Sequence, residues 1–505
     1  MKKVILIFLL AYTALASAQQ QNLPLNREFN LTNQKAFQVT GSSTHTSFQP
    51  VIQSQIHVNA DSVLSDTEKE HYMINLNKSY HKDRSWLIRK LLYENFLIVD
   101  TNDFYLTVDP LLNGELGKDS EDKSGRTLYK NTRGIMIRAN VGEKFSFETS
   151  VYENQIVAAP YLDNYITSKE AYRVVGIVPG QGRVKTFKKN GYDFSSSSAV
   201  LTYAPAKFLA LQMGTGKHFI GDGYRSLLLS DYSFNYPFFR AMATFGKRNQ
   251  FQYSQLNASI SSIVRRDLTA TPEALFVRKS MTTHYFNWMA TKWLDIGLFE
   301  MTMWHTEDST GTKPYEFQQL NPIIGINALT TATDKAHHSN VGANLKIKLP
   351  ANTIVYGQFL MDGNQYEKTT GIQAGARFQG IKGLTLQAEY NAMNNPYNNY
   401  FEPELEAFTN YNEPIAHPLG DHFQEVIGIL NYQYKRAFAE YKLGIREVSN
   451  VKSLVAQGHL GYMINPKNNL AAMIGFTERV AASKKETMYV YFGIRTNLRN
   501  LYDDF

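Results

Sequence analysis

The chain has 505 residues, a formal net charge of +7 and no cysteine. The lack of cysteine excludes disulfides and a lipid-anchored N-terminal Cys, and the modest positive surplus forms no basic stripe with interleaved aromatic residues of the kind that binds nucleic acid. Aromatic residues make up 13% of the chain, with Tyr 31, Phe 30 and Gly 32. This composition is typical of a membrane β-barrel with aromatic girdles, although a large secreted β-sandwich would share it.

A secretory signal peptide is expected at residues 1–18. Lys2 and Lys3 precede the apolar run Val4–Leu10, and the small residues Ala16–Ala18 form a cleavage site. Beyond this segment, no run approaches the roughly 18 apolar residues that a spanning helix needs. If the chain crosses a membrane, it must therefore do so as a β-barrel.

Residues 19–100 do not alternate and are expected to form a periplasmic helical or irregular segment. Trp86–Leu92 has the spacing of a helix, and Ser85 is placed to cap it. Such an element acts either as a plug or stabilising cap at the barrel mouth, which we favour, or as a helix that binds a partner.

Residues 101–505 are predicted to be all-β, as a transmembrane antiparallel barrel of about 18 strands in a bacterial outer membrane with both termini in the periplasm. Alternating apolar and polar residues, as in Ile135–Val141, indicate strands with one face toward lipid and one toward a lumen. Short turns are expected at Gly142–Glu143, Pro205–Ala206, Lys247–Asn249, Trp293–Asp295, Pro350–Asn352, Gly380–Gly383, Lys435–Arg436 and Asn465–Asn468. The long connections, expected to be extracellular, are 113–127, 158–193, 217–238, 265–280, 306–338 and 393–422.

Several predicted strands carry charged residues on the face opposite the apolar one. Lys346 and Lys348 do so in one strand, Glu389 in a second, and Glu440 and Lys442 in a third. The lumen is therefore predicted to be polar with both signs of charge. Such a wall fits a wet channel, or a lumen closed by infolded loops such as 158–193, but it does not indicate an ion-selective pore.

The last predicted strand places Val490 and Phe492 on the lipid face and Arg495 on the lumen face. We expect it to close the ring against the strand near Phe104. The aromatic Phe505 that follows resembles the closing signal by which outer-membrane barrels are recognised for insertion.

Gly221–Asp231 is the first candidate binding motif. Its glycines leave N–H groups exposed, and its polar side chains are of the kind that hydrogen-bond sugar hydroxyls or a uronic acid carboxylate. Alternatively, its arginine and last aspartate pair with each other or with the wall and fold the loop inward, anchored by Leu227–Leu229. The glycine spacing does not match a phosphate-binding loop. The candidate ligand-binding residues are Asp222, Tyr224, Arg225 and Asp231.

A second candidate is the aromatic and polar stretch at residues 397–422. Rings stack on the C–H faces of sugars while hydroxyls take polar partners, although exposed aromatic residues also form interface girdles. No metal site is predicted, because prolines stiffen the irregular loop that carries the histidines. A third segment, Phe317–Gly325, is interpreted as a structured loop. The candidate sugar contacts are Tyr400, Tyr411, His417 and Asp421.

Catalysis is not indicated by the sequence. Ser226 and Ser230 lie near His218, but the spacing of a nucleophile elbow is absent. We therefore expect a non-enzyme without cofactors.

The quoted motifs resemble a known family. The runs Asn131–Gly134, Glu153–Gln155, Gly221–Asp231 and His417–Gly420, with Phe147, are similar to the Wzi-like capsule-assembly barrels of the Bacteroidota, including RemB-type gliding-motility proteins. The resemblance implies an outer-membrane barrel of about 18 strands with periplasmic N-terminal helices that associates with surface polysaccharide.

Three functions stay open. The first is a non-catalytic protein that binds or assembles surface polysaccharide (capsule or exopolysaccharide), with or without a link to gliding or adhesion. The second is a porin or transporter for small solutes, and the third is a structural partner of an envelope secretion or gliding complex. The expected partners are surface polysaccharide, outer-membrane lipid and envelope or gliding machinery proteins, without nucleic acid.

Overall fold

The computed structural model describes residues 20–56, 83–169, 176–265, 276–308, 311–312, 316–332, 337–362, 370–394, 407–420, 422–482, 484–496 and 499–505. The expected signal peptide, residues 1–18, lies outside the described residues.

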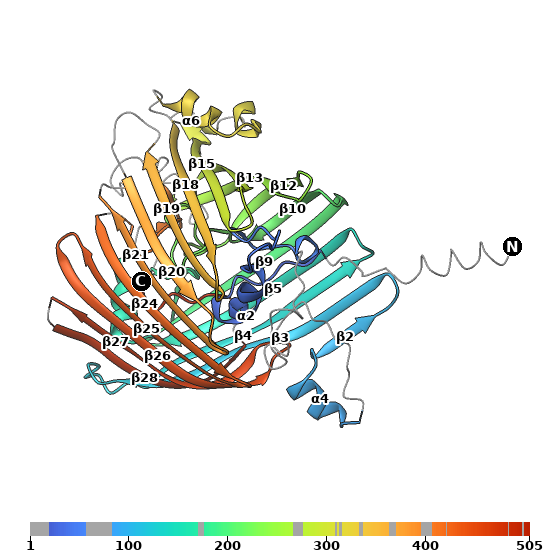
Figure 1. The fold of residues 1–505 in the computed structure, drawn as a ribbon. Coiled ribbons are helices and arrows are strands. Elements are labelled where there is room, and N and C mark those ends of the chain that lie inside the picture. Colours follow the sequence, from blue (N-terminus) through green and yellow to red (C-terminus); the bar gives the residue numbers. More distant parts are fainter. Residues whose placement is uncertain are drawn as a thin grey trace.

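The predicted all-β barrel is confirmed. Within the described part of the chain, eighteen antiparallel strands form one closed ring (Figure 1), and the short strands β2 (Leu97–Asp100) and β8 (Lys185–Phe187) each add to one neighbour. In ring order the strands are β3 (Phe104–Asp119), β4 (Leu128–Val141), β5 (Phe145–Val157), β9 (Gly191–Ala206), β10 (Leu209–Gly216), β12 (Tyr236–Phe245), β13 (Phe251–Arg265), β14 (Phe276–Met289), β15 (Leu294–His305), β18 (His337–Leu349), β19 (Thr353–Asp362), β20 (Thr370–Phe378), β21 (Leu384–Met393), β24 (Phe423–Tyr434), β25 (Ala437–Val448), β26 (Val451–Asn465), β27 (Leu470–Ala481) and β28 (Lys484–Thr496).

The ring closes between β28 and β3, as expected, but in a different register. Tyr489 pairs with Asp119 and Arg495 with Asn113, so the closing contact lies at the far end of β3 from Phe104. The prediction that a connection begins at residue 113 is therefore wrong, because these residues hydrogen-bond to β28 and extend β3 to Asp119. Near its start, β3 pairs with β2 instead.

The two faces of the wall differ as the alternation predicts. On β18, Leu345 is 42% exposed and Lys346 is 1% exposed, and on β28, Phe492 is 56% exposed and Tyr489 is 4% exposed. A closed ring pairs every backbone group within the wall, and its apolar outer face can meet lipid without a buried polar penalty. This is the architecture of a transmembrane barrel.

The two ends of the barrel carry different connections. The predicted short turns lie at or within two residues of the turns at one end, here called the short-turn end. The connections that leave the strands at the opposite end, here called the long-loop end, contain small elements: α5 (Pro160–Ser168), β6 (Ile177–Val178), β7 (Gly182–Arg183), β11 (Phe219–Ile220), β16 (Glu307–Asp308), β17 (Gly311–Thr312), the 3-10 helix η4 (Phe317–Leu320), α6 (Ile326–Thr331), β22 (Thr409–Asn410) and β23 (Glu413–Pro414).

The N-terminal segment contains α2 (Arg27–Phe37), β1 (Phe48–Gln49), the 3-10 helix η2 (Gln53–Gln55) and α4 (Trp86–Leu92). The predicted helix at Trp86–Leu92 is present, but Ser85 stands at its N-cap without a capping hydrogen bond from its side chain. In the described part of the chain, no helix has the length and apolar character needed to cross a bilayer.

Among the described residues, three segments that are remote in sequence occupy the lumen: residues 20–55, residues 217–235 and residues 499–505. Figure 1 shows α2 within the ring of strands. The first two segments pair as β1 with β11, and the Asn500 N–H donates to the Leu25 carbonyl at 3.1 Å, joining the third to the first. The segments therefore form one connected filling inside the wall.

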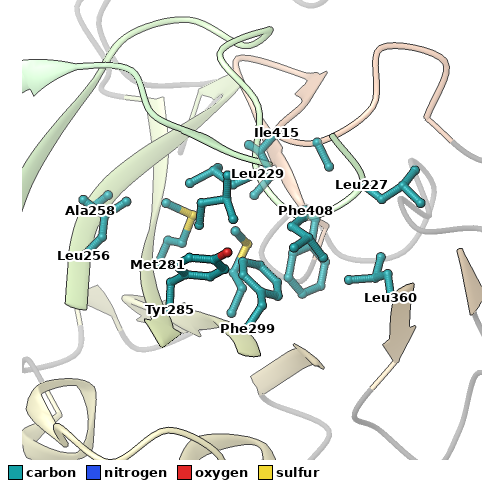
Figure 2. Close-up of a cluster of buried hydrophobic side chains, with 14 of the residues drawn as sticks. Leu227, Leu229, Leu256, Ala258, Met281, Tyr285, Phe299, Leu360, Phe408 and Ile415 are labelled. Atoms are coloured by element: carbon teal, nitrogen blue, oxygen red, sulfur yellow. The ribbon is translucent and has the colours of Figure 1, made fainter. Parts of the chain in front are cut away.

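The lumen is not uniformly polar. Leu227 and Leu229 of the second segment pack with Met281 and Phe299 of the wall and with Ile415 (Figure 2), and each of these five side chains is at most 2% exposed. Burying a leucine side chain contributes about 1.5–3 kcal/mol. This apolar cluster therefore holds residues 217–235 inside the barrel.

Phe505 lies inside the folded protein, and its role as an insertion signal stays a prediction. Its side chain is 8% exposed and packs inside the protein, with ring centroids 5.9 Å from Tyr161 and 4.2 Å from Tyr165. Its main-chain oxygen accepts hydrogen bonds from Arg446 and Arg479. In the folded protein this aromatic residue therefore helps to fill the lumen.

Candidate functional site

Arg225 lies at the centre of the first candidate motif and is 1% exposed. Its guanidinium contacts the carboxylates of Glu425 on β24 at 3.3 Å and Asp504 at 3.2 Å. Although burial alone would lower it, the pKa of Arg225 is raised well above its usual value by these two carboxylates. Glu389 on β21 accepts hydrogen bonds from the Tyr224 and Arg225 N–H groups. The guanidinium therefore joins the motif to the wall and to residues 499–505 of the lumen filling.

Asp222 holds the start of the same motif to the wall. It pairs with Lys346 on β18 at 2.9 Å and accepts hydrogen bonds from Asn344 and from Ser47 of the N-terminal segment. Burial alone would raise the pKa of Asp222, but Lys346 lowers it below its usual value. Lys346 also contacts Asp295 at 3.2 Å, which completes a buried network of both signs.

Tyr224 and Asp231 hydrogen-bond to residues 499–505. The Tyr224 hydroxyl donates to Asp504 at 2.7 Å and accepts from Lys442 at 2.7 Å. Burial and the neighbouring Asp504 raise the pKa of Tyr224 to about 12, so the phenol stays protonated near neutrality. Asp231 accepts hydrogen bonds from Asn500 and from the hydroxyl of Tyr502. Arg225 and Asp231 thus pair with other groups, not with each other.

The second motif is split. His417 is 1% exposed, contacts Glu425 at 3.1 Å and stacks on Phe423 with ring centroids 4.1 Å apart. Burial lowers the pKa of His417 below its usual value despite the Glu425 carboxylate. Tyr411 is only partly buried at the long-loop end. Tyr400 and Asp421 lie outside the described residues.

The structure thus brings Arg225 and His417 together on one carboxylate, Glu425, and joins Tyr224 and Arg225 through Asp504. Asp222, Tyr224, Arg225, Asp231 and His417 are all at most 7% exposed, and each has partners within the protein. A sugar could reach them only after those partners had moved. Their role in ligand binding stays a prediction, as does that of the two residues outside the described part.

A more accessible group of side chains lies at the long-loop end. The rings of Phe234 and Tyr411 are 4.7 Å apart between centroids, and the Arg183 guanidinium lies 5.0 Å from the ring of Phe276. Phe276 and Tyr411 pack on the same small apolar cluster, and the positive charges of Arg183 and Arg278 are close enough to Tyr411 to oppose the rise in its pKa that burial causes. We call these five residues the aromatic–arginine surface. Its three rings are half-buried and both arginines are exposed.

Sequence reasoning found only Tyr411 of this surface. The other four residues lie in or beside three different long connections, and no spacing along the chain relates them. The one available signal was the aromatic and arginine content of loops expected to share one end of a barrel. Burial raises the pKa of Tyr411 while the two arginines oppose the rise, so its phenol is neutral at physiological pH.

A buried acid, Glu413, and a buried amine, Lys217, lie near each other at the long-loop end. The Gly180 N–H is shared between the two carboxylate oxygens of Glu413, at 3.0 and 3.2 Å, and Lys217 donates to the Gly180 carbonyl at 2.7 Å. Burial raises the pKa of Glu413 to about 7, and burial lowers the pKa of Lys217 to about 8. These groups join the loop at residues 176–187 to the lumen filling.

One group of side chains in the described residues could hold a metal ion. The ligand atoms of Glu28 on α2, Glu440 on β25 and His459 on β26 lie within 4.8 Å of one another. Arg495 occupies the Glu28 carboxylate at 3.1 Å, so a cation there would have to displace a guanidinium. The residues considered for catalysis are apart: Ser226 donates to the Ile220 carbonyl, and His218 contacts Tyr236.

Comparison with known proteins shows what the fold resembles. No family model and no curated protein sequence matches the chain. Among solved structures, it is similar to Wzi of Escherichia coli, described as an outer membrane protein involved in group 1 capsule assembly and a carbohydrate-binding β-barrel. That match has a TM-score of 0.57 and 12% identity, and covers 94% of this chain and 98% of Wzi.

Two further solved structures are similar at a lower level. Acinetobacter baumannii OccAB4 matches with a TM-score of 0.45 and 11% identity, and the match covers 78% of this chain and 98% of OccAB4. A BenF-like porin from Pseudomonas fluorescens matches with a TM-score of 0.45 and 9% identity, and the match covers 78% of this chain and 98% of the porin.

Proposed function

We propose that the chain is a non-catalytic outer-membrane β-barrel that binds surface polysaccharide at its long-loop end, which faces the outside of the cell, with its described terminal segments entering from the periplasm. The observation that carries the proposal is the filled lumen. Three segments are joined to the wall and to one another by buried charge pairs and an apolar cluster. Such a filling favours a binding protein over a channel.

The chemistry of the aromatic–arginine surface supports a carbohydrate ligand. Half-buried rings offer flat faces to sugar C–H groups, and an exposed guanidinium pairs with a carboxylate through two parallel hydrogen bonds. Arg183 and Arg278 flank Tyr411, so an acidic polysaccharide fits better than a neutral one. The description of Wzi as a carbohydrate-binding barrel of capsule assembly adds support from a protein of similar fold.

Binding to purified acidic capsular polysaccharide tests the proposal, with the barrel held in lipid nanodiscs. Removing a stacking ring or a charged hydrogen bond costs about 1–2 kcal/mol, so Tyr411→Ala and Arg183→Ala should each weaken binding by about tenfold. Arg183→Lys should recover only part of the loss, because an amine lacks the planar fork. Lys123→Ala, at an exposed position of another connection, serves as the control.

Single-channel recording of the same protein distinguishes a binding protein from a porin. We expect no stable conductance from the intact barrel. A large, steady conductance would refute the binding proposal and establish a channel. A deletion strain scored for capsule retention and for colony spreading would separate a role in capsule assembly from one in gliding or adhesion.

A further inference from the structure

The wall carries a polar patch on its outer face. Near the short-turn end, β15 alternates between buried and exposed residues, but from Phe299 onward both of its faces are buried, and β14 shows the same change. Phe299 and Met301 belong to the apolar cluster in the lumen, so Glu300 between them points outward. It is the seventh of the twelve residues of β15 and thus lies near the middle of that strand.

Neighbouring strands extend this patch. The His284 ring nitrogen Nδ1 lies 3.0 Å from the Glu300 carboxylate, and the hydroxyls of Thr302 and Ser339 are 2.8 Å apart. A carboxylate facing hydrocarbon is strongly unfavourable, most of all near the centre of the bilayer. None of the patch residues is more than 1% exposed; they are Thr282, His284, Glu300, Thr302 and Ser339.

Residues 316–332, here called the outer flap, cover the patch. The flap contains η4 and α6, and α6 packs against β15 and β18 (Figure 1). The Glu300 carboxylate accepts hydrogen bonds from the Gly325 N–H at 2.8 Å and the Ala328 N–H at 2.6 Å. Thr331 bonds to Ser339 at 2.7 Å. The side chains of β13 and β14 contact flap carbonyls as well: Tyr253 to Pro322, Gln255 to Asn321, and Thr282 to Gln319.

The polarity of the flap is reversed relative to a surface helix in water. Gln319, Asn327 and Thr331 are buried toward the wall, at most 2% exposed. The side chains turned away from the wall are apolar, and the sequence has no charged residue from Phe317 to Ala332. Their exposed fractions are 88% for Phe317, 50% for Leu320, 59% for Ile323, 37% for Ile326 and 76% for Leu329.

We propose that the outer flap is embedded in the membrane and that its apolar outer face contacts lipid acyl chains. Five exposed apolar side chains on one face are unfavourable in water and favourable against hydrocarbon. The apolar face of the flap continues the lipid-facing band of the wall, where Leu298 and Leu345, on the strands that the flap covers, are 46% and 42% exposed. The flap thus gives a polar stretch of wall an apolar outer surface. The inference does not depend on polysaccharide binding.

Spin labelling tests the depth of the flap, and the chain is well suited to it because it contains no cysteine. Leu329→Cys and Phe317→Cys would each carry a nitroxide in phosphatidylcholine proteoliposomes. Leu345→Cys on the lipid-facing wall and Lys123→Cys in an exposed connection serve as the lipid and water controls. We expect labels at both flap positions to collide more often with oxygen, which concentrates in the bilayer, than with a water-soluble nickel chelate, as at Leu345.

Two results would overturn the proposal. More frequent collisions with the nickel chelate would place the flap in water, and an immobilised label shielded from both reagents would show that protein, either a partner or a second copy, covers it. Glu300→Ala in the Leu329→Cys background should increase label mobility, because the N–H groups of Gly325 and Ala328 lose their acceptor. Glu300→Gln, which keeps an acceptor oxygen, should change mobility less.

Discussion

Replacing Arg225 by alanine tests whether the candidate motif is held by buried charge. The change leaves the carboxylates of Glu425 and Asp504 without the guanidinium that lies 3.3 and 3.2 Å from them. Breaking a buried ion pair by removing one partner costs about 3–5 kcal/mol. Each carboxylate retains other partners, His417 for Glu425 and Lys442 for Asp504. We therefore expect a loss of about 3 kcal/mol in the free energy of unfolding, at the lower end of that range.

The measurement is a guanidinium titration of the barrel folded in lipid vesicles, followed by tryptophan fluorescence at pH 7. Arg225→Lys keeps the charge and should lose less, and Arg248→Ala, in an exposed short turn, is the control. An Arg225→Ala variant that unfolds at the wild-type midpoint and slope would refute the reasoning, because the carboxylates would then not need the guanidinium.

The pH dependence of this loss has a definite sign. Although burial alone would raise it, Arg225 and Lys442 hold the pKa of Asp504 well below its usual value. A group with a depressed pKa contributes stability that is present above its unfolded pKa, about 4, and is lost as the pH falls through the folded value. Without Arg225 the carboxylate protonates more readily. The difference between wild type and Arg225→Ala should therefore shrink as the pH is lowered below about 4.

Three further predictions concern the filling and the turns. Because burial raises the pKa of Glu413 to about 7, the folded state retains a proton that the unfolded state loses, so the free energy of unfolding should fall as the pH rises from about 4.5 to 7. Glu413→Gln should flatten that slope in titrations at several pH values, and an unchanged slope would show that another group is responsible. Leu228→Ala removes a fully buried side chain from the apolar cluster and should cost about 2–5 kcal/mol in the same titration; a cost below about 1 kcal/mol would mean that the cluster does not hold the segment. Gly383→Ala and Gly125→Ala both place alanine at positive φ, +73° and +68°, but only at Gly383 does the added Cβ meet backbone, the Gln433 carbonyl. We expect about 1 kcal/mol of strain at Gly125 and a larger loss at Gly383, and equal losses would rule out the clash.

The wall of the barrel could be predicted from the sequence because its rule is local. Successive side chains on a strand point to opposite faces, so the alternation of Leu345 with Lys346, or of Phe492 with Tyr491, shows which residues meet lipid without any knowledge of the neighbours. Turns also depend on residues close in sequence, and their predicted positions were accurate to within two residues.

The contents of the lumen depend on contacts between residues that are far apart in the chain. Arg225 meets Asp504 across 279 residues, and Asp222 meets Lys346 across 124. A glycine-rich loop with arginine and aspartate has the same composition whether it binds sugar or fills a barrel. The available partners decide between these roles, and they lie on other strands.

The sequence by itself determined a closed β-barrel, its lipid-facing residues and the end that carries its long loops, because these follow from a period of two and from local turn chemistry. Only the tertiary structure decided that Phe505 turns inward and that Phe317 and Leu329 turn outward. An aromatic or leucine side chain favours any apolar surroundings, whether lumen core or membrane. Which of the two it occupies is set by where the rest of the chain places it.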